Sequence, residues 1–85
     1  MKYLYFSAPW CGPCRMFGPV MERVGATVPV QKVNVDENQE LAMQYSVRSV
    51  PTVILVDNTG KEFTRQVGVQ KEQMLLEQYN NFANV

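Results

Sequence analysis

The stretch Ala8-Pro9-Trp10-Cys11-Gly12-Pro13-Cys14 decides how this chain is organised. It holds the only two cysteines among 85 residues, and they lie three positions apart. An apolar run, Lys2 to Ser7, precedes the stretch, and apolar residues with helical spacing follow it. This pattern predicts a dithiol or disulfide centre on the first turn of a helix, with the rest of the chain as its scaffold.

The two cysteines are in different positions relative to the predicted helix. The thiolate attacks disulfides, and the unpaired N–H groups and partial positive charge of a helix N-terminus stabilise it. We therefore expect a lowered pKa at Cys11, which lies beside Trp10 in a loop that a substrate can reach, and assign it as the nucleophile.

Cys14 follows almost one turn later on the same face. We expect it to be more buried, with a higher pKa, and to act as the resolving thiol. Gly12 and Pro13 give a tight, stiff link between the two.

Two other roles for a cysteine pair fit this chain less well. A disulfide that only stabilises the fold gains about 2 kcal/mol from so short a loop, against roughly 4.5 kcal/mol for one closing most of the chain. Zinc or an iron–sulfur cluster generally takes four ligands, whereas the chain has two thiols and no histidine. A metal site shared between two copies stays open at this point.

Length and composition predict one small domain, residues 1–85. Hydrophobic residues make up 46% of the chain, too many for a disordered one. The eight basic and eight acidic residues cancel, which argues against nucleic acid or an anionic membrane as the main partner. No segment approaches the roughly 18 apolar residues of a membrane span, and the first apolar run is shorter than that of a signal peptide. We therefore expect a cytoplasmic monomer, and in that compartment paired cysteines more often perform redox or metal chemistry than staple a fold.

Periodicity along the chain predicts the element order β-α-β-α-β-β-α. A first helix should begin near Pro13, be kinked by Pro19 and end at a Gly25 cap. The strand Thr52–Val56, β-branched and almost wholly apolar, should be central, and Asp57–Gly60 should form a hairpin turn. The other predicted elements are strands Lys2–Ser7, Val28–Val35 and Lys61–Val67, a short helix Asn38–Tyr45 and a final helix Lys71–Phe82, with Ala83–Val85 frayed.

Several segments of the chain resemble the thioredoxin family. They are the active-site motif Trp10-Cys11-Gly12-Pro13-Cys14, the helix proline Pro19, the strand Lys32–Asp36, the cis-proline segment Val50-Pro51-Thr52 and the pair Val67-Gly68. The resemblance covers nearly the whole chain. It implies an α/β thioredoxin-like fold with a four-stranded mixed sheet flanked by helices, lacking the family's usual N-terminal strand and helix.

The resemblance also implies a substrate groove next to the cysteines. Pro51 should follow a cis peptide bond close to them, and the backbone of Val50 should pair with a substrate as a short added strand. Trp10 and Gly68 should complete the groove. Other roles stay open for these residues: Pro51 as an ordinary turn residue, Gly68 as the end of a strand and Trp10 as packing.

Three positions depart from the family pattern. Tyr5 stands where the family usually has a buried aspartate that helps the resolving cysteine to lose its proton. A phenol is a poor base at neutral pH, so either water takes that role or resolution is slower. Lys32 matches the family's buried lysine, and here its ammonium could reach the Tyr5 hydroxyl, extend to solvent or simply be an exposed strand lysine. Ser7 replaces a second tryptophan.

These features together predict a protein-disulfide oxidoreductase without a bound cofactor that keeps cytoplasmic protein thiols reduced. The resemblance implies that its redox-active disulfide, Cys11–Cys14, receives electrons from NADPH through a flavin-dependent thioredoxin reductase. Two alternatives remain: a glutathione-coupled, glutaredoxin-like reductase, and a binding subunit in which the cysteines are incidental.

Overall fold

The strands and helices follow the predicted order in a computed structural model, which describes residues 1–84. In chain order they are β1 (Lys2–Ser7), α1 (Gly12–Gly25), β2 (Val30–Asn34), α2 (Gln39–Gln44), β3 (Thr52–Val56), β4 (Glu62–Val67) and α3 (Glu72–Ala83). The strands form one sheet in the order β2-β1-β3-β4, with β1 parallel to β2 and the other two pairs antiparallel. The mixed four-stranded sheet and the central place of β3 are therefore confirmed.

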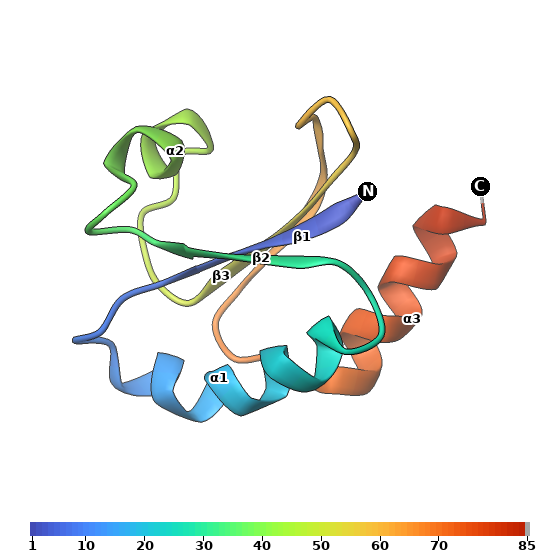
Figure 1. Cartoon of the computed structure of the whole chain (residues 1–85), viewed down its shortest axis with the longest axis horizontal. Helices are drawn as coiled ribbons and strands as arrows, with labels where there is room; N and C mark the ends of the chain where they lie inside the picture. Colours follow the sequence, from blue (N-terminus) through green and yellow to red (C-terminus); the bar gives the residue numbers. More distant parts are fainter. Residues whose placement is uncertain (85) are drawn as a thin grey trace.

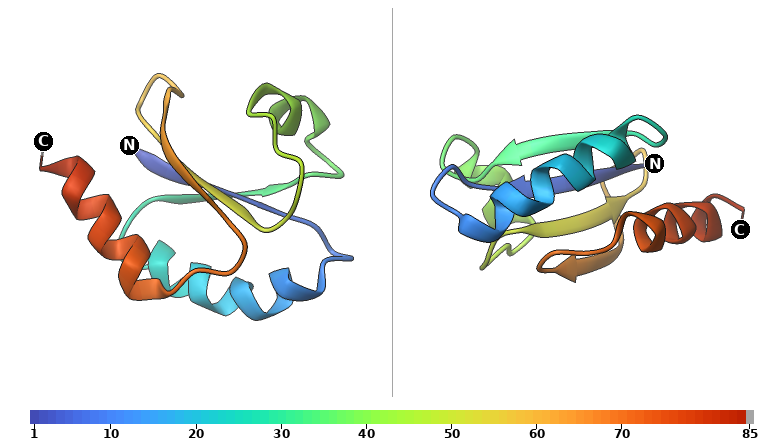
Figure 2. Two further views of the ribbon diagram at one scale, coloured as in Figure 1. Left: turned by 180° about the vertical axis from the view of Figure 1, so that it is seen from behind. Right: turned by 90° about the horizontal axis from the view of Figure 1, so that it is seen from below.

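Helices cover both faces of the sheet. Helices α1 and α3 lie on one face and the short α2 lies on the other (Figure 1), and the two further views show the same layering (Figure 2). This arrangement explains why β1 is apolar throughout. Tyr3 and Tyr5 pack on the α1 and α3 side, while Leu4 and Phe6 join the core under α2.

Several boundaries differ from the prediction. Strand β2 begins at Val30 rather than Val28, because the N–H of Val28 still bonds to the carbonyl of Val24 at 2.9 Å. Gly25 is not the cap of α1: it is the last helical residue, and Ala26 caps the helix with an ordinary right-handed conformation. Pro19 lies inside α1, as predicted. Gly60 closes the predicted hairpin turn with a φ of +88°. Of the residues expected to fray, Ala83 ends α3, and Val85 lies outside the described residues.

Strand β2 forms one edge of the sheet. The N–H of Tyr3 bonds to the carbonyl of Pro29, and the N–H of Val35 bonds to the carbonyl of Ser7. In a parallel ladder with this register, the backbone groups of alternate residues face the partner strand. The backbone groups of Val30 and Lys32 therefore face outward.

The C-terminal helix α3 is fixed to the sheet and to helix α1 by a buried contact and two polar ones. Leu75 is fully buried, and the hydroxyl of Tyr3 donates to its carbonyl at 2.7 Å. Burial raises the pKa of Tyr3, so this hydroxyl stays protonated as a donor. Arg23 on α1 pairs with Glu72 at 2.7 Å. None of the helices in residues 1–84 combines the length and apolar character that a membrane crossing needs.

Truncating Leu75 should test how much α3 contributes to stability. We expect Leu75→Ala to lower the free energy of unfolding by roughly 2–4 kcal/mol, because it leaves a cavity in a closed core. Leu76→Ala is the matched control, since Leu76 is only partly buried at the next position of the same helix. Urea titration of both variants measures the difference, and equal losses would contradict this account of the packing.

Candidate active site

The active-site loop is a short connection between a buried strand and a helix start. After β1 ends at Ser7, the N–H of Cys11 turns back to bond to the carbonyl of Ala8 at 3.2 Å. Cys11 then caps α1, and Pro13 occupies the first turn of the helix as predicted. At this place the missing proline N–H costs nothing, because first-turn N–H groups have no partner within the helix.

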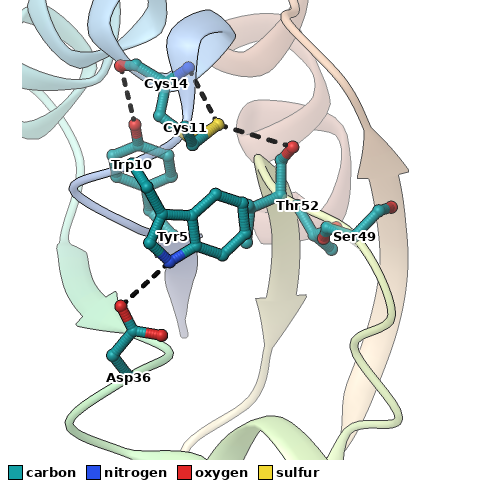
Figure 3. Close-up of a disulfide and its surroundings, with 8 residues drawn as sticks. Tyr5, Trp10, Cys11, Cys14, Asp36, Ser49 and Thr52 are labelled. Atoms are coloured by element: carbon teal, nitrogen blue, oxygen red, sulfur yellow. Dashed lines mark hydrogen bonds between the residues drawn. A yellow bond between two sulfur atoms is a disulfide. The ribbon is translucent and has the colours of Figure 1, made fainter.

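The two cysteines form a disulfide, with their Cα atoms 5.3 Å apart. Figure 3 shows the Cys14 backbone N–H directed at Cys11 Sγ, at a nitrogen–sulfur distance of 3.2 Å. The sulfur therefore takes the position that a serine or asparagine oxygen takes at many helix starts. The same N–H would stabilise a thiolate at Cys11 once the disulfide is reduced.

The expectation that Cys14 is the more buried cysteine is wrong for this oxidised form. The two residues are 4% and 6% exposed, respectively. Both belong to one small cluster with Ala8, against which Val35 and Val50 pack. Because a disulfide joins the two side chains, the residues that bury one cysteine also bury the other.

The segment before β3 lies against the disulfide. The Val50–Pro51 peptide bond is cis, as predicted, and the Val50 carbonyl oxygen is 3.6 Å from Cys11 Sγ. Gly68 donates its N–H to the Pro51 carbonyl at 2.8 Å and has a φ of +93°. A glycine suits this position, because that backbone conformation strains any other residue, and its place in the groove stays a prediction. Pro51 itself is buried, so it lies beneath the expected groove rather than on its surface.

Trp10 is exposed rather than packed in the core. Its side chain is 67% exposed, and its indole Nε1 donates to Asp36 Oδ2 at 3.0 Å (Figure 3). With Val50 it borders a shallow hollow of about 150 Å³. The sequence did not single out Asp36 as a partner of Trp10. One feature of the sequence could have indicated this contact. Asp36 follows β2 at the same end of the sheet at which β1 leads into the cysteine loop.

The side chains at the three departures from the family pattern, Tyr5, Ser7 and Lys32, lie on the Cys14 side of the disulfide. The Tyr5 hydroxyl is 3.4 Å from the Cys14 carbonyl, and burial raises the pKa of Tyr5 even though hydrogen bonding from Ser7 acts the other way. Tyr5 is thus a donor and not a base at neutral pH. Lys32 is exposed on β2, next to Tyr5 in the register, so the exposed-lysine alternative is the one observed. Ser7 is buried.

A cavity of about 320 Å³ opens beside Cys14 on this side. Residues that the sequence did not single out, Arg15, Gly18 and Asn34, line it together with Tyr5, Ser7 and Lys32. They come from α1, β1 and β2, which only the fold brings together. Among residues 1–84 no group of three or more histidine, cysteine or carboxylate side chains could hold a metal ion.

Comparison with known proteins agrees with this geometry. The family model described as thioredoxin matches residues 2–81. The chain belongs to the thioredoxin family. Thioredoxins are thiol-disulfide oxidoreductases that need no prosthetic cofactor, and this family member carries the redox-active cysteine pair.

Individual thioredoxins match most of the chain. It is 42% identical to the thioredoxin of Chlamydia pneumoniae over 81 residues, which cover 92% of this chain and 78% of that protein. It is 40% identical to the thioredoxin of Bacillus subtilis, covering 88% and 75%. The X-ray structure of Fasciola hepatica thioredoxin superposes with a TM-score of 0.83 at 37% identity, covering 94% and 78%.

Removing the Asp36 carboxylate should release the Trp10 indole. We expect Asp36→Ala to lower the fluorescence anisotropy of Trp10, the only tryptophan, while changing the free energy of unfolding by less than about 1 kcal/mol. Glu37→Ala, at the neighbouring exposed acid, is the control and should change neither. Unchanged anisotropy in the Asp36 variant would show that the bond does not hold the indole in solution.

The role of Tyr5 can be tested through pH. A pKa raised above the ordinary tyrosine value by burial leaves the hydroxyl neutral around neutral pH, so its ionisation cannot shape the activity profile there. We expect Tyr5→Phe to keep the shape of the pH–rate profile between about pH 6 and 9, with rates within about threefold. Tyr79→Phe on α3 serves as the control. A titration step that disappears only in the Tyr5 variant would mean that the phenol acts as a base.

Proposed function

We propose that this chain reduces disulfides in other proteins, with Cys11 as the nucleophile and Cys14 as the resolving thiol. The observation that carries the proposal is the Cys14 N–H directed at Cys11 Sγ at the start of α1. This N–H and the helix dipole favour negative charge on one sulfur of the pair, Cys11.

The exchange proceeds in two steps. The Cys11 thiolate attacks one sulfur of the substrate disulfide, and the other substrate sulfur leaves as a thiolate that takes up a proton. Cys14 then loses its proton and attacks Cys11 Sγ in the mixed disulfide, which releases the second substrate thiol. The substrate gains two electrons and two protons, and the chain returns to the Cys11–Cys14 disulfide.

The Cys14 proton needs an acceptor other than a side-chain carboxylate. Within the described residues, no aspartate or glutamate lines the cavity beside Cys14, and Tyr5 is a donor. The lining of this cavity includes the polar side chains of Tyr5, Ser7 and Asn34, and the cavity has room for several water molecules, each of which occupies roughly 30 Å³ in the liquid. Water in this cavity therefore takes the proton.

The substrate docks on the side of the disulfide formed by Trp10, Val50 and Gly68, with Pro51 supporting Val50 from below. The exposed Trp10 and Val67 offer apolar contact area. An extended substrate segment pairs with the backbone of Val50, next to Cys11. Gly12 and Pro13, between the two cysteines, are exposed.

The remaining expectations, which come from the sequence and from the family resemblance, belong to this proposal. Protein disulfides are the substrates, and thioredoxin reductase supplies electrons from NADPH. Residues 1–85 act as one domain and as a cytoplasmic monomer. Comparing recharging by NADPH with thioredoxin reductase against recharging by glutathione separates the thioredoxin-type from the glutaredoxin-like alternative.

Insulin reduction tests the function and the two cysteine roles together. We expect the wild-type chain to accelerate insulin reduction by dithiothreitol, and both Cys11→Ser and Cys14→Ser to abolish the acceleration. The reduced Cys14→Ser variant should accumulate a mixed disulfide with a substrate protein on Cys11, because the resolving thiol is missing, whereas Cys11→Ser should accumulate little. A wild-type rate no faster than dithiothreitol alone would refute the function, and trapping on Cys14 would reverse the roles.

A further inference from the structure

We call residues 46–50, which lie between α2 and β3, the docking loop. Both ends of this loop are attached to β4 and the residue that follows it. At the start of the loop, Arg65 on β4 donates from Nη2 to the carbonyl of Tyr45 at 2.6 Å. At its end, the N–H of Gly68, directly after β4, donates to the carbonyl of Pro51 at 2.8 Å. One end of the docking loop is therefore held by a side chain, and the other by the backbone.

The Arg65 guanidinium is oriented by Glu62. Its Nε and Nη2 donate to the two carboxylate oxygens of Glu62, each at 2.7 Å. Such a two-point pair fixes the plane of the guanidinium, and Nη2 has a second N–H to donate to the Tyr45 carbonyl. Hydrogen bonding within the pair lowers the pKa of Glu62 and raises that of Arg65, so both groups are charged at neutral pH.

A β-bulge makes this pair possible. Residues three apart in a regular strand point to opposite faces of the sheet. The ladder between β3 and β4 shifts register at Leu55 and Val56, which leaves Phe63 as an extra residue in β4. Glu62 and Arg65 therefore share the face that α2 covers, while Phe63 turns to stack on α3.

The docking loop continues from a helix that packing alone holds weakly. Helix α2 has six residues and buries Ala42, and a helix of that length is not stable by itself. The N–H of Val47 bonds back to the carbonyl of Ala42 at 2.8 Å, so the loop is joined to α2. Ser46 has a φ of +54°, which is costly for serine and persists where surrounding contacts hold it. Tyr45, between α2 and this turn, is the residue that Arg65 holds.

We propose that Arg65 is a positioning residue for the binding of protein substrates. Through the Tyr45 carbonyl it fixes the docking loop, and thereby sets where the backbone of Val50 meets an extended segment of the substrate. Among residues 1–84, the hydrogen bonds of Arg65 go to Glu62 and Tyr45, and none reaches the cysteines. The proposal rests on the proposed docking at Val50 and adds the side chain that holds the docking loop in place.

Rates with a large and a small substrate separate positioning from chemistry. Each pre-reduced variant reacts with insulin and with bis-hydroxyethyl disulfide, which is uncharged and too small to pair along the docking loop. The ratio of the two second-order rate constants is compared, so that changes in cysteine reactivity cancel. We expect Arg65→Gln to lower the insulin-to-small-disulfide ratio by roughly two- to tenfold, the range for the loss of one net hydrogen bond. An unchanged ratio would overturn the proposal.

The matched control is Arg23→Gln. It removes the same charge from another ion pair, in which Arg23 lies 2.7 Å from Glu72 between α1 and α3, and should leave the ratio unchanged. Arg65→Lys keeps the charge but cannot form the two-point pair and the Tyr45 bond together, so its ratio should stay below that of the wild type. Full recovery in Arg65→Lys would show that charge alone matters and would overturn the positioning role.

A second variant covers the case in which Arg65→Gln does not melt cooperatively. Glu62→Gln leaves Arg65 in place but weakens its orientation, and it then decides the test. A lowered ratio of the two rate constants supports the proposal, and a ratio equal to that of the wild type overturns it.

Amide hydrogen exchange shows whether Arg65 holds the docking loop. The N–H groups of Ser46 and Val47 bond to carbonyls of α2, and we expect them to exchange severalfold faster in Arg65→Gln, while those of β1 are unchanged. Equal exchange in the docking loop would overturn the proposal. This measurement is independent of activity. A pre-reduced wild-type chain that leaves insulin oxidised would instead refute the proposed function, and the exchange rates would still report on the loop.

Discussion

The hydrogen bond from the Cys14 backbone N–H to the Cys11 sulfur is the interaction on which the site depends. It exists only because α1 begins directly after Cys11, and α1 begins there because Pro9 and the Ala8 turn stop the buried strand β1. The two apolar layers that enclose β1 hold the strand in place, so the core fixes where the helix dipole acts. The chemistry of the pair is therefore set by backbone geometry more than by neighbouring charges.

Much of the fold could be predicted from local patterns. The period of the apolar residues gave the helices and strands, and the run Thr52–Val56 is central because it is buried on both faces. The errors concern the residues at which strands and helices begin or end. Val28 is apolar enough for a strand, but its N–H is already used by the last turn of α1. Glycine is a common residue at helix C-terminal caps, which is why Gly25 was predicted to be one. The actual cap, Ala26, has a right-handed conformation that needs no glycine.

The parts of the site that are contiguous in the sequence could be predicted, whereas the contacts that the fold creates between distant segments could not. The cysteine spacing and the Val50–Pro51 segment could be recognised in the sequence, the latter through the family resemblance. Asp36 could not be assigned, since its position beside Trp10 depends on how the end of β2 and the loop before α1 meet. The burial of Cys14 relative to Cys11 was also mispredicted, because burial was argued for separate thiols and the structure holds a joined pair.

The outward-facing edge of β2 has a consequence for how molecules of this chain behave next to each other. A strand edge is a template for pairing with a further strand, and among the described residues β2 is short, has β1 as its single, parallel neighbour and carries Lys32 at its centre. Two copies that joined antiparallel about that centre would set one ammonium against the other, which opposes sheet growth from molecule to molecule. The exposed lysine thus discourages self-polymerisation, and a neutral residue in its place would make concentrated solutions more prone to fibres.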